Sequence, residues 1–206
     1  LAGIIDPVVE NRTTAHAPGF STLDDVDVAA DGIILATPTD THAPLTIAAL
    51  ERGLHVLVEK PVAVSLAEAD EMIAASKRTG KKILVGHHRR HHPLVSKTVE
   101  ILSSGQIGRP LVASLLWCMK KPDDYFDVDW RKGVDGGPIK QNLIHDVETL
   151  RALFGEVISV TGAGSNVMRN ALRHESGGVV LTFDSGAIVT IAFSDATPTP
   201  WGFEAG

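Results

Sequence analysis

An acid, a base and a proline end the short apolar run Val56–Val58. The run predicts a strand that helices cover on both faces, so Glu59 and Lys60 lie at its carboxyl end. Ligands of open α/β sheets bind in the crevice outside such ends, and Pro61 restricts the backbone of Lys60. The pattern indicates an ammonium group held where a cofactor or substrate binds. The alternative is a solvated pair of loop charges.

Other polar residues follow apolar runs in the same way. Asp6 comes after the run 2–5, where a carboxylate can accept both hydroxyls of a ribose; the alternative is a turn-forming residue before proline. Thr37 and Thr39 follow the run 32–36, and their hydroxyls and nearby N–H groups can face a phosphate or ribose. His42 is either part of that site or a local cap of the next helix.

The segment His87–His92 contains four histidines and two arginines. Neighbouring side chains that leave a strand point to opposite sides, so these histidines do not converge on one ion. We therefore predict no metal site here. The segment instead indicates the basic mouth of a cleft that faces an anionic or hydroxylated ligand.

The elements that position these residues alternate over the first half of the chain. Apolar runs at 32–36, 54–58 and 83–86 predict strands, and the patterns at 43–52 and 66–79 predict the helices between them. Such alternation predicts a doubly wound parallel sheet of the Rossmann type. A further helix is expected over 93–103.

The pattern changes after Gly108. Strands are predicted at 111–119, 157–167, 179–183 and 188–193, with a hairpin turn at Asp184-Ser185-Gly186. One helix interrupts them, ends at Gly155 and carries His145 near its start. The fold class is therefore α/β, with a dinucleotide-binding domain over 1–105 and a second domain with an open antiparallel sheet over 106–206.

Composition excludes several kinds of partner. The formal net charge of -6 argues against nucleic acid and anionic membranes, and no apolar stretch approaches the roughly 20 residues that span a bilayer. The single cysteine, Cys118, forms no internal disulfide and no cysteine metal site. These features favour a reducing cytoplasm.

The chain resembles the glucose-fructose oxidoreductase, inositol dehydrogenase and rhizopine catabolism (Gfo/Idh/MocA) family. The resemblance covers essentially the whole chain and depends on the order of its motifs. These are Ala36-Thr37-Pro38 with His42, Glu59-Lys60-Pro61, Gly86-His87-His88-Arg89-Arg90, Trp130-Arg131, Gly136-Gly137-Pro138 and Asn142-Leu143-Ile144-His145-Asp146.

The resemblance implies a nicotinamide-dependent oxidoreductase that acts on a hydroxyl-bearing carbon of a sugar, inositol or similar polyol. Lys60 is then the catalytic lysine and His145 the acid/base. NAD is favoured over NADP because Asp6 would hold the adenosine ribose. The implied cofactor-binding residues are Asp6, Thr37, Thr39, His42, Glu59, Lys60, His88, Trp130 and Arg131. The family also implies a homo-oligomer built through the antiparallel sheet.

Two departures from the family pattern matter. Many members carry an aspartate four residues before the histidine, where this chain has Gln141, a residue that can orient a hydroxyl but carries no charge. The family's first strand and its GxGxxG phosphate loop would precede Leu1, so we expect a longer protein, incomplete here at both ends. A non-catalytic cofactor-binding or assembly relative of the same fold remains the alternative.

Overall fold

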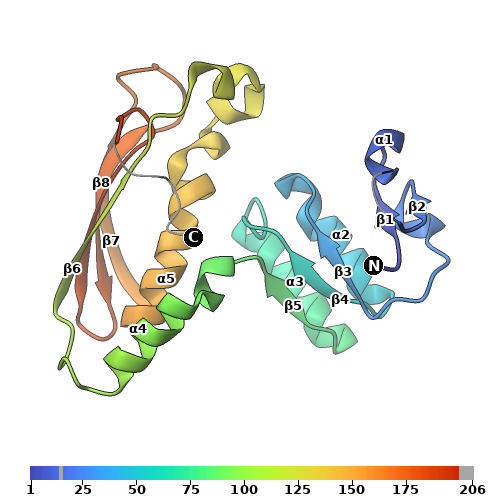
Figure 1. Ribbon diagram of the computed structural model, residues 1–206, viewed down its shortest axis with the longest axis horizontal. Helices are drawn as coiled ribbons and strands as arrows, with labels where there is room; N and C mark the ends of the chain where they lie inside the picture. Colours follow the sequence, from blue (N-terminus) through green and yellow to red (C-terminus); the bar gives the residue numbers. More distant parts are fainter. Residues whose placement is uncertain (14–15, 200–206) are drawn as a thin grey trace. The chain divides into compact units, whose positions relative to one another are not determined.

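The computed structural model describes residues 1–13 and 16–199, and it divides the chain into two compact units. The first unit is Leu1–Gly86 and the second begins at His87 (Figure 1). The sequence placed the domain boundary after residue 105. In the structure, the intervening helix packs against a helix of the second unit, which is why the division falls earlier.

The first unit contains a parallel sheet with the strand order β3-β4-β5. The strands are β3 (Gly32–Leu35), β4 (His55–Val58) and β5 (Ile83–Val85), and helices α2 (His42–Glu51) and α3 (Leu66–Thr79) connect them. The predicted order of strands and helices is confirmed. One core cluster joins the helices to the sheet, and its buried members are Leu35, Ala43, Ala49, Leu50, Val56, Val58, Met72 and Ala75.

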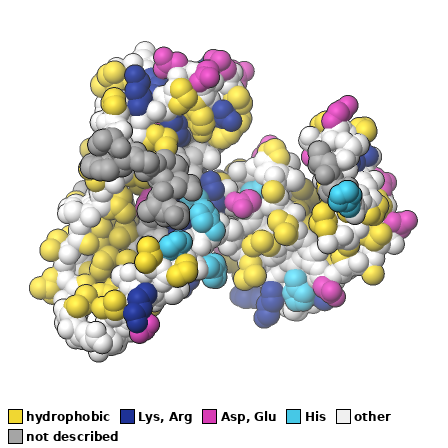
Figure 2. Space-filling model, in the orientation of Figure 1, with side chains coloured by type: hydrophobic (Ala, Val, Ile, Leu, Met, Phe, Trp, Pro, Cys, Tyr) yellow, Lys and Arg dark blue, Asp and Glu magenta, His cyan; other side chains and the backbone are white. Residues whose placement is uncertain are grey.

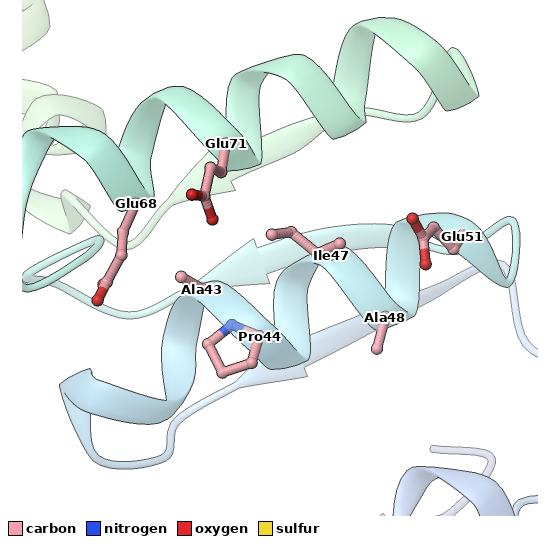
Figure 3. Close-up of a pocket in the computed structure, with 7 residues that line it drawn as sticks. All are labelled: Ala43, Pro44, Ile47, Ala48, Glu51, Glu68 and Glu71. Atoms are coloured by element: carbon pink, nitrogen blue, oxygen red, sulfur yellow. The ribbon is translucent and has the colours of Figure 1, made fainter.

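Local residues mark both ends of α3. Ser65 Oγ accepts a hydrogen bond from Glu68 N at 3.2 Å, and Gly80 ends the helix at φ 70°. Helices α2 and α3 lie side by side and border a groove of about 480 Å³. Figure 3 shows Glu51, Glu68 and Glu71 around this groove, which lies on the helical layer.

A second, two-stranded parallel sheet stands near the start of the chain. Strand β1 (Ile4–Ile5) pairs with β2 (Gly19–Phe20), and the single-turn helix α1 (Val9–Arg12) lies between them in sequence. The apolar run 2–5 of the sequence indicated β1. The sequence did not predict β2, because two residues beside Pro18 carry no periodic signal.

The face of the β3-β4-β5 sheet opposite the helices carries exposed apolar side chains. Ile34, Leu57 and Leu84 are register partners on neighbouring strands, and all three are exposed. Parallel sheets are normally covered on both faces. The apolar runs that predicted these strands therefore include side chains on a sheet face that the described residues leave uncovered.

The second unit contains a four-stranded sheet with the order β6-β9-β8-β7. Its strands are β6 (Val112–Cys118), β7 (Val157–Ser165), β8 (Ser176–Phe183) and β9 (Ile188–Ser194). The β7-β8 and β8-β9 pairs are antiparallel, but β6 runs parallel to β9. The sheet predicted to be antiparallel is therefore mixed, with one parallel pair. The long connection over 119–156 separates β6 from the next strand, β7, so no hairpin turn fixes the direction of β6 in the sheet.

Helix α5 (Ile144–Phe154) packs against one face of this sheet, and α4 (Pro93–Ser103) lies beside it (Figure 1). Both helices were predicted, and Gly155 ends α5 at φ 96°. A series of 3-10 turns over 123–136 was not predicted. The core between α5 and the sheet contains Trp117, Leu143, Leu150, Leu181, Phe183, Ala187, Val189, Ile191 and Phe193.

Candidate active site

The candidate residues fall into two groups, one in each unit. In the first unit, the carboxyl ends of β3, β4 and β5 meet at one edge because the strands are parallel. Glu59 and Lys60 follow β4 at this edge, and Gly86 follows β5. Lys60 thus lies at a strand end, as the sequence predicted. Its peptide bond to Pro61 is cis.

Glu59 lies across the end of β5. A Cβ at Gly86 would stand 3.0 Å from Glu59 Oε1, so the glycine makes room for the carboxylate. Glu59 Oε2 also accepts a hydrogen bond from Lys60 N at 3.2 Å. Glu59 thus helps to shape the backbone from which the Lys60 side chain leaves.

Asp6 follows β1, as predicted, and its carboxylate organises the turn that begins there. Oδ1 accepts a hydrogen bond from Val8 N at 2.8 Å, and Oδ2 accepts one from Asn11 Nδ2 at 3.0 Å. Both oxygens serve the turn that the sequence offered as the alternative role. A carboxylate has further lone pairs, so these two bonds leave capacity for ribose hydroxyls.

The loop after β3 brings three of the predicted residues together. Thr37 Oγ1 accepts a hydrogen bond from Thr41 Oγ1 at 2.7 Å, and Thr39 begins a 3-10 turn before α2. Thr41 is the N-cap residue of α2. His42 is 1% exposed, and its ring nitrogens lie 2.8 Å from Pro61 O and 2.9 Å from Thr37 O.

In the second unit, His145 lies in the first turn of α5 and is 7% exposed. The π-helical turn Ile139–Leu143 precedes it and carries Gln141, which is half-buried. Such turns often occur at functional sites. The ring of His145 meets two other histidine rings edge-on, with centroids 4.8 Å from His88 and 6.1 Å from His87.

The two arginines of the basic segment face α5. Arg89 Nη1 donates to Asp146 Oδ1 at 2.9 Å, and Arg90 pairs with Glu148. Burial raises the pKa of Asp146, while the charge and hydrogen bond of Arg89 act in the opposite direction. These ion pairs connect the segment to α5, a use of its charge that the sequence did not anticipate.

Trp130 and Arg131, the remaining predicted cofactor residues, lie in a 3-10 turn. Trp130 is 51% exposed. Arg131 Nη1 donates to Tyr125 O at 2.9 Å, and its guanidinium group stacks over the rings of Tyr125 and Trp130. Arg131 thereby stabilises the irregular segment before the π-helical turn.

Sequence reasoning missed a polar cluster beside this segment. Lys121 Nζ donates to Asn142 Oδ1 at 3.0 Å, next to Gln141 in sequence. Burial lowers the pKa of Lys121 to about 8, although the charge of Asp195 acts in the opposite direction. Asp195 accepts hydrogen bonds from Arg169 and the buried Arg173. The sequence signal that could have found this cluster is the position of Lys121 and Asp195, each within three residues of the end of an apolar strand.

The predicted site residues do not line either of two surface pockets. One is the groove between α2 and α3, and the other, of about 470 Å³, lies between the 3-10 turns and the loop 169–173. Within residues 1–13 and 16–199, no group of acidic, histidine or cysteine side chains has the arrangement of a metal site. In the same ranges, no helix has the length and apolar character needed to cross a membrane.

Comparisons with known proteins cover nearly the whole chain. Residues 1–87 match the family described as "Oxidoreductase family, NAD-binding Rossmann fold", and residues 95–205 match the "GFO/IDH/MocA C-terminal domain". The chain is 31% identical to a scyllo-inositol 2-dehydrogenase (NAD(+)) of Bacillus subtilis, over 84% of this chain and 51% of that protein. It is 30% identical to a 1,5-anhydro-D-fructose reductase of Ensifer adhaerens, over 86% of this chain and 55% of that protein.

The fold is also similar to solved structures. The WlbA dehydrogenase from Bordetella pertussis, solved in complex with NADH and UDP-GlcNAcA, matches with a TM-score of 0.87 and 26% identity, over 96% of this chain and 60% of that chain. The chain spans about half the length of the curated relatives that it matches.

Proposed function

Because the chain belongs to the Gfo/Idh/MocA oxidoreductase family, we propose that the protein is a nicotinamide-dependent dehydrogenase or reductase. It acts on a hydroxyl-bearing carbon of a sugar, inositol or similar polyol, the classes named for its relatives. The observation that carries the proposal is the position of Lys60 in Glu59-Lys60-Pro61, at the carboxyl end of a parallel strand.

Lys60 donates a hydrogen bond to the substrate oxygen. Oxidation of a carbinol removes a proton from that oxygen, and reduction of a carbonyl places negative charge on it. An ammonium group at hydrogen-bond distance stabilises this charge in either direction. Pro61 and the Glu59 carboxylate support the role by shaping the backbone beside Lys60.

His145 exchanges the hydroxyl proton as acid/base. Its burial and its packing against His88 hold the imidazole in one orientation, which a proton-transfer group requires. Gln141 precedes it by one helical turn and orients the substrate hydroxyl by hydrogen bonding. Because glutamine carries no charge, we propose that this chain takes a different substrate set from members with aspartate at this position.

NAD is the proposed cofactor, and the donor set at the strand ends fits it. Asp6 accepts the ribose hydroxyls, while the hydroxyls of Thr37 and Thr39 face the dinucleotide backbone. Glu59, His88, Trp130 and Arg131 border the nicotinamide half. When bound, the cofactor accepts or supplies the hydride, and these side chains orient it. The exposed stripe of Ile34, Leu57 and Leu84 supports further secondary structure over the sheet in the whole protein.

We also propose that the protein forms a homo-oligomer. We further propose that it resides in a reducing compartment such as the cytoplasm. The face of the second sheet opposite α5 carries exposed apolar side chains, among them Val112, Leu116, Val180 and Ile188. Figure 2 shows hydrophobic side chains gathered over this sheet. Such a surface is typical of a subunit interface. Cys118 is unpaired, which suits a reducing compartment.

The test is an assay of turnover with NAD and a panel of inositols, sugars and sugar nucleotides, in which the absorbance of NADH is the readout. Lys60→Ala and His145→Ala should each abolish turnover, while calorimetric NAD binding stays close to wild type. Lys77→Ala, at an exposed position of α3, is the matched control and should keep full activity. NAD binding without turnover on any substrate would instead favour the non-catalytic alternative.

A further inference from the structure

The side chain of His42 joins two loops that the proposed function assigns to cofactor and catalysis. His42 is the first residue of α2 and is 1% exposed. Its Nδ1 lies 2.8 Å from the carbonyl oxygen of Pro61, and its Nε2 lies 2.9 Å from that of Thr37. Both distances are those of hydrogen bonds, and both partners are backbone acceptors, so the neutral ring donates to one of them and the doubly protonated ring donates to both.

The two loops leave neighbouring strands, and the imidazole extends their connection. A ladder hydrogen bond from Glu59 N to Leu35 O, at 2.9 Å, joins β3 and β4 at their carboxyl ends. Thr37 and Pro61 each lie two residues beyond that bond. The ring of His42 thus joins the two loops at a point beyond this hydrogen bond of the sheet.

We propose that His42 is a positioning residue, which holds the Lys60–Pro61 loop through Nδ1 and the Thr37 loop through Nε2. Pro61 O belongs to the residue directly after Lys60, so this contact limits the backbone from which the ammonium group extends. A displacement of about 1 Å at a reacting group can lower turnover by about a hundredfold. The Thr37 contact acts instead on the loop proposed to bind the dinucleotide.

The burial of the ring supports this role over direct contact with the cofactor. Both nitrogens already lie against carbonyl oxygens, and the ring presents almost no surface to solvent. A buried polar group that lost these partners would be left unsatisfied, at a cost in stability. His42 therefore acts on the site through the two loops.

Two isosteric variants separate the contacts. The amide nitrogen of His42→Asn occupies the position of Nδ1 and places a donor beside Pro61 O. That of His42→Gln approaches the position of Nε2 and places a donor beside Thr37 O. We expect His42→Asn to keep kcat within about threefold and to raise the KM for NAD. We expect His42→Gln to lower kcat by about tenfold or more, with little change in that KM.

The inference uses the proposed function only for these kinetic measurements, so a second measurement is independent of turnover. In ¹H–¹⁵N spectra of the purified protein, His42→Gln should shift the amide signals of Lys60 and Val62 more than those of Thr39 and Asp40. His42→Asn should show the reverse order. His16→Gln, at an exposed position of the same unit, is the control and should shift neither set.

The outcomes are distinguishable. If the wild type turns over no polyol, the proposed function fails, and the amide shifts still decide whether His42 holds the two loops. If both variants change kcat, KM and the melting temperature in parallel, or shift both loops equally, His42 is a general core residue and the positioning role is wrong.

Discussion

The rings of His88 and His145 meet edge-on, with centroids 4.8 Å apart and ring planes at 61°. An aromatic pair of this geometry contributes about 0.5–1.5 kcal/mol beyond its buried area. We expect His88→Ala to lower kcat roughly two- to tenfold, because the proposed acid/base loses one packing surface. Steady-state kinetics of the purified protein measure this.

His88→Phe is the matched variant, because it keeps a ring beside His145 and removes the imidazole nitrogens. We expect it to retain most of the wild-type kcat. An equal loss in both variants would mean that the nitrogens of His88 matter and that ring packing does not explain its role.

Lys121 makes stability depend on pH above neutrality. Its pKa falls from 10.5 to about 8 on folding, chiefly because burial disfavours the charged form. Between these two values the unfolded chain binds more protons than the folded protein, so this group increases the free energy of unfolding as pH rises. Lys121→Met should remove this contribution, and its stability relative to wild type should fall across the same window.

Urea unfolding at several pH values from 8 to 10.5 measures the difference. Lys120→Met, at the exposed neighbouring position, should leave the pH dependence of wild type unchanged. Parallel pH curves for wild type and Lys121→Met would contradict the lowered pKa.

Asp195 is fully buried between two guanidinium groups. It accepts hydrogen bonds from Arg169 Nη1 at 2.9 Å and from Arg173 Nη1 at 2.7 Å. Asp195→Asn should lower the free energy of unfolding by about 3–5 kcal/mol, because it removes the carboxylate that pairs with the buried Arg173. Denaturant unfolding measures this loss. Glu51→Gln, which breaks an exposed ion pair with Arg78, should cost no more than about 1 kcal/mol.

Asp6→Ser separates the two roles of the Asp6 carboxylate. A serine hydroxyl can still accept the hydrogen bond from Val8 N but carries no negative charge. We expect weaker NAD binding and a smaller preference for NAD over NADP, with little change in thermal stability. Titration with each dinucleotide provides the measurement. An unaltered preference would show that the ribose is recognised elsewhere.

Leu116→Glu tests the proposed interface on the second sheet. Leu116 is 60% exposed, and a buried carboxylate there would oppose association. We expect a smaller assembly by light scattering after gel filtration. Leu94→Glu, at a 69% exposed position of α4, should leave the assembly unchanged. A wild-type monomer, or an unchanged assembly in Leu116→Glu, would exclude this surface.

The sequence by itself determined the elements whose signals are local. Short apolar runs located β3, β4 and β5, while Ser65, Gly80 and Gly155 marked helix ends. These signals depend on backbone geometry within a few residues, so they can be recognised without knowledge of the fold. The same reasoning placed Lys60 at a strand end, whereas its catalytic role came from the family resemblance.

Tertiary structure decided everything that depends on residues far apart in sequence. It paired β6 with β9 in parallel, because the long connection over 119–156 leaves the direction of β6 open to packing. It brought His42 to Pro61, Arg89 to Asp146, and Asp195 to Arg173. No local periodicity encodes these contacts, since each depends on which buried polar groups must find partners once the elements have packed.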